Sequence, residues 1–150
     1  MRKAVYACLV ALTAIGQSPA VGAETINEAA RRWGLIGSWM VDCAQPASRS
    51  NYRLTYVEKS GQLFLDREWG DGRDSSVITR AAIQADGKLD LSIYFAGLNP
   101  PHTRQNLLVK DGDGRLRAWA NVDLNSGEFS VRDGLFERNR QPTPTQARCN

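Results

Sequence analysis

The chemistry open to this chain is limited first by its single histidine, His102. Serine and cysteine nucleophiles usually need a neighbouring base, and imidazole is the commonest one. His102 follows Pro100 and Pro101 in a segment that we expect to be a loop, and the chain has no G-x-S-x-G nucleophile motif. We therefore interpret His102 as an exposed loop residue and expect the protein not to be an enzyme.

Acidic residues form two further patterns that could carry chemistry. Asp111-Gly112-Asp113-Gly114 begins like a calcium-binding loop, but Arg115 stands where the next oxygen ligand is needed, so a hairpin turn is the better interpretation. Asp66 and Glu68 share one face of an expected strand, and Arg67 between them points the other way. We interpret these two carboxylates as solvated groups rather than as a glycosidase pair. No metal and no cofactor is expected.

The first residues have the features of an export signal. Arg2 and Lys3 precede an apolar run at residues 4–16 that is too short to span a bilayer, and Val21-Gly22-Ala23 fits a signal-peptidase site. We expect residues 1–23 to be a signal peptide and residues 24–150 to be a single domain, periplasmic or secreted, without a membrane span. A membrane-anchoring helix is the alternative.

The cysteines point to an oxidising compartment. Loss of the leader removes Cys8 and leaves Cys43 and Cys149, an even pair that is typical of a disulfide in an exported protein. Two free thiols or a metal pair are the alternatives, but one histidine and no C-x-x-C leave zinc few ligands. In the chain-entropy model such a long-range bond stabilises the fold by about 4–5 kcal/mol.

The charge of the chain argues against a nucleic-acid partner. There are 19 basic and 16 acidic residues, a formal net charge of +3, and two of the basic residues, Arg2 and Lys3, belong to the leader. The other basic residues are scattered among aspartates. They form no stripe of the kind that a phosphate backbone requires.

The elements that must position these residues are a short helix followed by strands. Thr25 and Glu28 fit the capping-box pattern and Gly34 can end a helix, which predicts a helix over 25–33 that closes one end of the core. A helix lying on a membrane surface is the alternative. Strands are predicted over 36–43, 52–58, 62–69, 75–84, 88–95, 104–110, 115–122, 128–132 and 135–138.

The strand pattern favours an all-β antiparallel fold. Alternation is clearest at 88–95, and Asp86-Gly87 before it predicts a type I′ hairpin turn. Short turns and the lack of a crossover helix favour a meander, which we expect to close into an eight-stranded up-and-down, lipocalin-like barrel because closure removes the sheet edges. A Greek-key sandwich is the alternative.

Aromatic residues on the predicted strands are the candidates for binding a ligand. They could line a cavity for an apolar ligand, or they could fill the interior completely. The possible ligand-lining residues are Tyr52, Tyr56, Trp69, Phe95 and Trp119.

Two resemblances bear on this fold. Gly37-Ser38-Trp39 at the start of the first strand resembles the G-x-W signature of lipocalin and avidin-like barrels. That resemblance implies that Trp39 closes one end of the barrel with Gly37 and an arginine from near the last strand, Arg148 or Arg138.

The second resemblance covers most of residues 24–150. The chain resembles a group of small exported bacterial proteins, uncharacterised in function, with a G-x-W-x-x-D-C-x-x-P front and an R-D-G-x-F…T-P…R-C ending. The matching positions are Gly37, Trp39, Asp42, Cys43, Pro46, Arg132, Asp133, Gly134, Phe136, Thr143, Pro144, Arg148 and Cys149. The resemblance implies no particular activity.

These observations favour a non-enzymatic protein that binds a small apolar or amphiphilic ligand inside the barrel. The alternative is a periplasmic protein-binding module, such as an inhibitor of lysozyme or of a protease, with loop 96–102 as its inserting element. An enzyme is the third hypothesis, and it lacks a base and nucleophile set.

Overall fold

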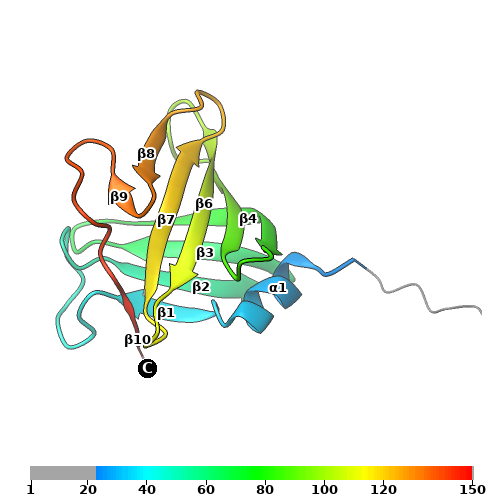
Figure 1. Ribbon diagram of the computed structural model, residues 1–150, viewed down its shortest axis with the longest axis horizontal. Helices are drawn as coiled ribbons and strands as arrows, with labels where there is room; N and C mark the ends of the chain where they lie inside the picture. The colour runs from blue at the N-terminus through cyan, green and yellow to red at the C-terminus, as the bar shows by residue number, and fades with distance from the viewer. Residues whose placement is uncertain (1–22, 150) are drawn as a thin grey trace, which may run out of the picture.

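The computed structural model describes residues 23–149, which form one helix and ten strands (Figure 1). The elements are α1 (Ile26–Trp33), β1 (Gly37–Met40), β2 (Arg53–Lys59), β3 (Gln62–Glu68), β4 (Arg73–Ile83), β5 (Leu89–Phe95), β6 (His102–Lys110), β7 (Leu116–Asp123), β8 (Phe129–Arg132), β9 (Leu135–Phe136) and β10 (Ala147–Cys149). The expected signal peptide, apart from Ala23, lies outside the described residues.

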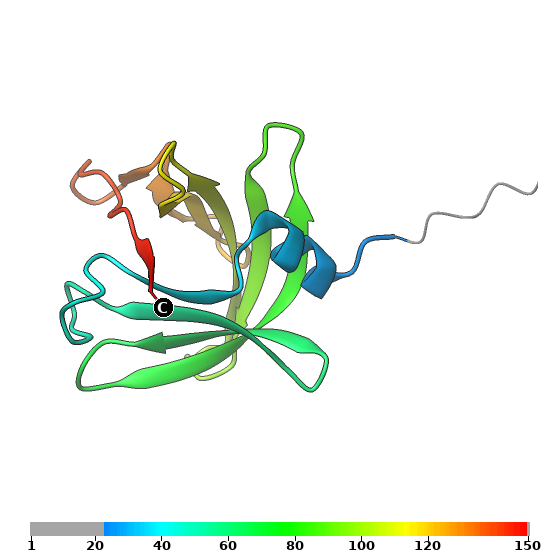
Figure 2. The same cartoon turned by 90° about the horizontal axis from the view of Figure 1, so that it is seen from below.

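All strands belong to one antiparallel sheet with the order β10-β1-β2-β3-β4-β5-β6-β7-β8-β9. Each strand from β1 to β8 pairs with the next, as a meander requires, and β10 returns to pair with β1 (Figure 2). The all-β antiparallel class is therefore as predicted. The sheet is strongly coiled, because β2 and β3 run across the view of Figure 1 while β6 and β7 run up it.

The number of strands differs from the predicted eight, and the sheet is not a closed ladder. Its two ends, β9 and β10, do not pair with each other. A single bridge instead joins Leu116 at the start of β7 to Gln146, next to β10, with N–H to O distances of 2.9 and 2.8 Å. The extra strand β10 was missed because its three residues are too few to show a period of two.

The turn before β5 shows a second difference. Gly87 has a φ of +83° and its N–H donates to the carbonyl of Gln84, while the N–H of Gln84 donates to Lys88. This is a three-residue loop with a glycine bulge, not the predicted two-residue type I′ turn. Two successive positive φ angles, as a type I′ turn needs, occur instead at Ser60 and Gly61.

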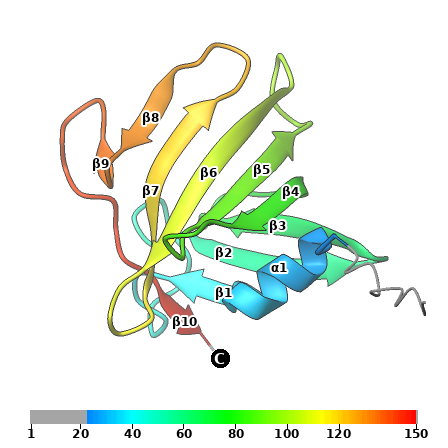
Figure 3. The ribbon, with the colours of Figure 1, turned by 45° about the vertical axis from the view of Figure 1, so that its right-hand side comes forward.

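Helix α1 lies across one end of the sheet and packs mainly on β4 (Figure 3). Thr25 and Glu28 form the capping box, and Gly34 ends the helix with a φ of +75°. Ala29 and Ala30 are fully buried. We call this end, with turns 60–61, 84–88 and 111–115, the helix end. The opposite end, with segments 41–52, 69–72, 96–101, 124–128 and 137–141, is the loop end.

The apolar core fills the half of the molecule nearer the helix end. The inward face of β5 illustrates it, since Leu89, Leu91 and Ile93 have no exposed surface and Phe95 is 5% exposed. The partly buried Ile26 and Trp33 of α1 pack against this cluster. The closely packed apolar core therefore lies beside α1, and the interior toward the loop end is lined by a different set of residues.

Candidate ligand-binding cavity

A cavity of about 530 Å³ occupies the interior of the sheet toward the loop end. No residue of α1 lines it. Its walls come from strands β2, β3 and β5 to β9 and from the segments before β2, after β3 and before β10. The lining residues are Arg49, Tyr52, Leu54, Tyr56, Leu65, Arg67, Trp69, Phe95, Arg104, Asn106, Leu108, Leu116, Ala118, Asn121, Ser130, Val131, Phe136, Thr143, Pro144 and Gln146.

The structure brings four of the five predicted aromatic residues together in this lining: Tyr52, Tyr56, Trp69 and Phe95. They come from different elements, and no local sequence signal joins them. Trp119 is the exception and does not line the cavity.

The physical reason is the alternation of side chains along β7. Leu116 and Ala118 face the cavity, so Trp119, the next residue, lies on the other side of the strand. A bulge at this point, where Leu107 pairs with Ala120 and Leu108 with Ala118, brings Asn121 rather than Ala120 into the lining. Its ring lies near Gly134 and has the Lys88 ammonium 5.6 Å from its centroid.

Three arginines, Arg49, Arg67 and Arg104, are the charged residues of the lining, and it contains no carboxylate. Sequence reasoning did not single them out as site residues. The signal was present for Arg67, whose position between Asp66 and Glu68 turns it inward. It was weak for Arg104, because the residues of β6 mix polar and apolar types on both faces.

Arg67 is held in place by groups that face it from the neighbouring strands. Its guanidinium makes a two-point ion pair with Asp74, its cross-strand partner on β4. The guanidinium also lies 4.7 Å from the Phe95 ring centroid and 5.9 Å from that of Trp69. The charge of Arg67 is therefore largely compensated by Asp74, and the guanidinium makes cation–π contacts with two aromatic rings.

Arg104 is placed differently, because no carboxylate within the described chain lies in ion-pair range of it. Its Nε atom is buried and has no hydrogen-bond partner among the described residues. On β6 it is followed at alternate positions by Asn106 and Leu108, which also line the cavity. The lining of this strand therefore changes from charged to polar to apolar toward the helix end.

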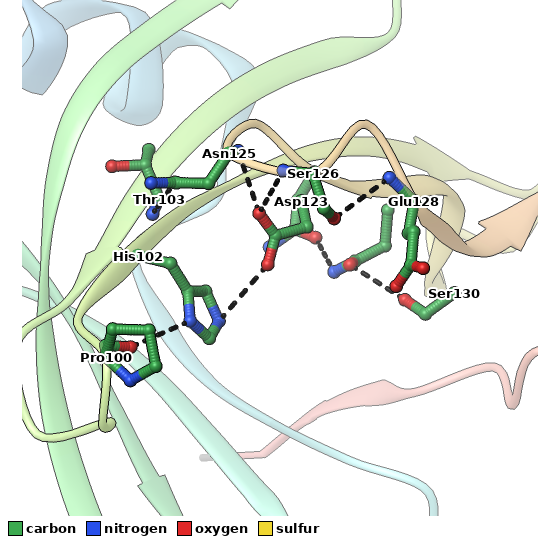
Figure 4. Close-up of polar contacts among 10 residues, drawn as sticks. Pro100, His102, Thr103, Asp123, Asn125, Ser126, Glu128 and Ser130 are labelled. Carbon is green, nitrogen blue, oxygen red and sulfur yellow. Dashed lines mark hydrogen bonds and ion pairs between the residues drawn. The ribbon is translucent and has the colours of Figure 1, made fainter.

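Asp123 is the cross-strand partner of Arg104 on β7, but its carboxylate is engaged elsewhere (Figure 4). It accepts from the N–H groups of Asn125 and Ser126 at 2.8 and 3.2 Å, and it lies 3.7 Å from Nε2 of His102. The hydrogen bond from Asn125 is the main cause that lowers the pKa of Asp123, with smaller contributions from Ser126, His102 and Arg104.

His102 is not the exposed loop residue that the sequence suggested. It is the first residue of β6, its side chain is 20% exposed, and its ring centroid is 6.1 Å from that of Phe95. Its Nδ1 contacts the carbonyl oxygen of Pro100 at 3.3 Å (Figure 4). The pairing of β6 with β5 extends further toward the prolines than the sequence pattern indicated.

The acidic pair on β3 lies on the outer face. Glu68 pairs with Arg53, its cross-strand partner on β2, and Asp66 pairs with Lys59 from the end of β2. Residues 111–114 form a turn in which the Asp111 side chain accepts from the N–H groups of Asp113 and Arg115. Within residues 23–149 no cluster of three or more metal-binding side chains occurs.

Gly37, Trp39 and Arg148 meet at the helix end. Trp39 is 2% exposed and donates from its indole to the carbonyl of Leu35 at 2.8 Å. Arg148 faces Trp39 across the β1–β10 pairing and donates to the carbonyl of Ile36 at 2.6 Å. Its guanidinium occupies the space that a Cβ at Gly37 would fill. Arg138, the other arginine considered for this position, is exposed.

Cys43 and Cys149 are joined by a disulfide, with Cα atoms 5.5 Å apart. The bond ties segment 41–52 to β10. Asn51 is 8% exposed, and its side chain bonds both the N–H and the carbonyl of Asp42 at 2.9 Å, which orders the same segment from inside. Arg49 and Tyr52, which line the cavity, are thereby held on a fixed segment.

Comparisons of the chain with models of protein families, with curated proteins and with solved structures find no match. Within residues 23–149 there is no helix long and apolar enough to cross a membrane. The cavity and its lining are therefore the features on which a function can be argued.

Proposed function

We propose that this protein is a non-enzymatic binding protein that holds a small apolar or amphiphilic ligand in its interior. The observation that carries the proposal is the cavity of about 530 Å³. Its size falls within the range of about 300–1,000 Å³ that is typical of small-molecule sites, which combine apolar walls with a few polar groups. Tyr52, Tyr56, Trp69 and Phe95 leave this space open rather than filling it.

We also propose that the sheet is a lipocalin-like barrel and that the chain is an exported member of the small bacterial group that it resembles. The bridge between Leu116 and Gln146 supports the barrel, because it brings β7 next to β10. The Cys43–Cys149 disulfide supports export, because such bonds persist in oxidising compartments such as the periplasm or the extracellular space.

The test uses a neutral lipophilic dye, N-phenyl-1-naphthylamine, whose fluorescence rises in an apolar site. The Ala118→Phe variant places a ring in the cavity, since Ala118 is a lining residue. The matched control is Ala120→Phe, on the same strand but outside the lining. We expect the dye to bind the wild type and the control similarly, and Ala118→Phe to bind at least about tenfold more weakly because the cavity volume is lost.

The proposal is wrong if the wild type does not bind the dye, or if both phenylalanine variants bind it as well as the wild type. Circular dichroism and thermal unfolding of each variant establish that weaker binding is not a loss of the fold. Native mass spectrometry of protein purified from its own cell envelope adds an independent measurement, in which we expect a co-purifying small molecule.

A second candidate function, inhibition of a hydrolase, has one observation in its favour. Leu98 and Leu124 are 42% and 52% exposed, in loops 96–101 and 124–128. The second loop is held next to the start of β6, because the N–H of Leu124 donates to the carbonyl of Thr103 and the N–H of Thr103 donates to the side chain of Asn125. Exposed apolar side chains on adjoining loops are typical of protein contacts. Inhibition of lysozyme or of a protease by the wild type, and its loss in Leu98→Ser, would support this function over the first.

A further inference from the structure

We infer that the ligand of the cavity is a monoanionic amphiphile, with a carboxylate or a similar oxyanion bound at Arg104 and an apolar tail directed toward the helix end. The inference rests on the proposed function and specifies the class of ligand. It depends on three features of the lining: its charge, the unpaired state of Arg104, and the order of polar and apolar residues along the strands.

The charge of the lining selects an anion. Arg49, Arg67 and Arg104 contribute to it, and no aspartate or glutamate does. Arg49 and Arg67 each pair with an aspartate, Asp71 and Asp74. Because these two arginines are in ion pairs, Arg104 is the lining arginine without one, and the Asp123 carboxylate on β7 interacts with it only at longer range.

Arg104 also has unused hydrogen-bonding capacity at a buried atom. Its Nε is buried without a partner, and a buried donor in that state is rare unless something else completes it. The carboxylate of Asp123 does not do so, because it accepts hydrogen bonds from the backbone N–H groups of Asn125 and Ser126 in the adjoining turn (Figure 4). The planar fork of a guanidinium matches the two oxygens of a carboxylate.

The neighbours of Arg104 on the same face fit a head group of this kind. The Asn106 side chain accepts from the amide of Asn121, so its own NH₂ group remains available to donate. Ser130 donates to Asn121 at 2.8 Å, which fixes the orientation of that amide. A carboxylate near Arg104 would therefore accept hydrogen bonds from Arg104 and Asn106, and no carboxylate among the lining residues would repel it.

The strands then define where the tail lies. From the loop end toward the helix end, the cavity-facing residues are Arg104, Asn106 and Leu108 on β6. The same direction along β3 passes from Arg67 to Leu65. Arg104 and Arg67 thus lie toward the loop end of their strands, and the apolar side chains of Leu108 and Leu65 lie nearer the helix end. An amphiphile whose head group lies at the arginines and whose tail contacts Leu65 and Leu108 matches both the polar and the apolar part of the cavity.

The test compares decanoate with decanol, which share a ten-carbon chain and differ in the head group. Each displaces N-phenyl-1-naphthylamine from the wild type, from Arg104→Gln, and from the control Arg73→Gln, which removes an exposed arginine outside this cavity. We expect decanoate to bind the wild type at least about tenfold more tightly than decanol, because a charged hydrogen-bonded pair is worth that much. Arg104→Gln removes this preference, and Arg73→Gln keeps it.

Two outcomes overturn the inference, and they differ in what they say about the proposed function. If the dye binds but decanoate and decanol compete equally in the wild type, the site is a ligand site without an anion preference. If neither the dye nor either competitor binds, the proposed function fails as well.

The comparison of decanoate with decanol in the wild type needs no variant, so it tests the anion preference even if Arg104→Gln does not fold. Arg104→Lys keeps the positive charge but loses the planar guanidinium, and we expect it to retain part of the preference for decanoate.

Discussion

Tyr56 shows how the position of a single residue changes its acid–base behaviour. Its side chain is 3% exposed and lines the cavity from β2. Burial is the main cause that raises its pKa far above the usual value, Tyr52 raises it further, and the charge of Arg67 has an opposite, smaller effect. Burial also raises the pKa of Tyr52. The native protein therefore strongly prefers the neutral phenol at this position.

This preference predicts a loss of stability in alkaline solution. The phenol of Tyr56 ionises in the unfolded chain at a pH of about 10 but not in the native state, so its contribution is complete below that pH and falls above it. We expect the free energy of unfolding to decrease above about pH 10 by about 1.4 kcal/mol per pH unit for this tyrosine. Urea unfolding across this range measures it.

The control is Tyr56→Phe, which has no group to ionise. Its free energy of unfolding should fall less steeply with pH than that of the wild type, since only the other titrating groups remain. Equal slopes for the two proteins would show that Tyr56 ionises as easily in the native state as in the unfolded chain.

At this scale the sequence identified Tyr52, Tyr56, Trp69 and Phe95 because aromatic residues on strands point to a core or a cavity. It could not identify Arg104 as a site residue. The importance of Arg104 comes from the turn that holds the carboxylate of Asp123, and that turn is a tertiary feature. Trp119 was included among the ligand-lining candidates because the sequence of β7 did not show which of its faces points inward; Leu116 and Ala118 do, and Trp119 alternates with them.

Among the elements, helix α1 depends on a side chain from the far end of β6. The Lys110 ammonium donates to the carbonyls of Trp33 and Gly34, at 2.7 and 3.2 Å, where the helix leaves carbonyls without partners. It also lies 4.4 Å from the Trp33 ring centroid. Burial is the main cause that lowers the pKa of Lys110, and repulsion from Arg148 lowers it further. This contact fastens α1 to the sheet.

Replacing Lys110 by methionine tests that contact, because methionine keeps an apolar stem and removes the donors. We expect Lys110→Met to lower the free energy of unfolding by about 1–3 kcal/mol, the cost of leaving two partly buried carbonyls unpaired. The matched control is Lys59→Met. Lys59 forms an exposed pair with Asp66, and its loss should cost less than about 1 kcal/mol. Similar losses in chemical denaturation would contradict a special role for Lys110.

The elements were the part of the fold best predicted from the sequence, and the reason is local. The capping box of Thr25 and Glu28, and the alternation of Leu89, Leu91 and Ile93, are signals contained within a few residues. The turn at Gly87 was located correctly but its type was not, because an Asp-Gly pair suits both a type I′ turn and a glycine bulge.

For the whole molecule, the wall between β7 and β1 depends on few contacts. Strand β10 pairs with β1 over three residues, and the bridge at Leu116 links the residue before β10 to β7. The Cys43–Cys149 disulfide fixes this region to segment 41–52 across a sequence separation of 106 residues. That covalent link therefore holds in place a part of the sheet that has little pairing of its own.

Reduction of this disulfide should destabilise the protein markedly. In the chain-entropy model a bond across a loop of this length contributes about 4–5 kcal/mol. We expect a reductant to lower the free energy of unfolding of the wild type by about that amount in guanidinium denaturation. The double variant Cys43→Ser, Cys149→Ser should match the reduced wild type and should not respond to the reductant. Two reactive thiols in the unfolded, unreduced protein would show that the bond is not formed.

The pairing of β1 with β10 also sets the order in which the molecule can be completed. Most strands find their partner in the next strand along the chain, but one edge of β1 stays unpaired until residues more than a hundred positions later return to it. Because long loops close slowly, the β2–β7 meander can form first and this seam last. A folding intermediate with the meander built and the edge of β1 exposed would be the species most prone to aggregate.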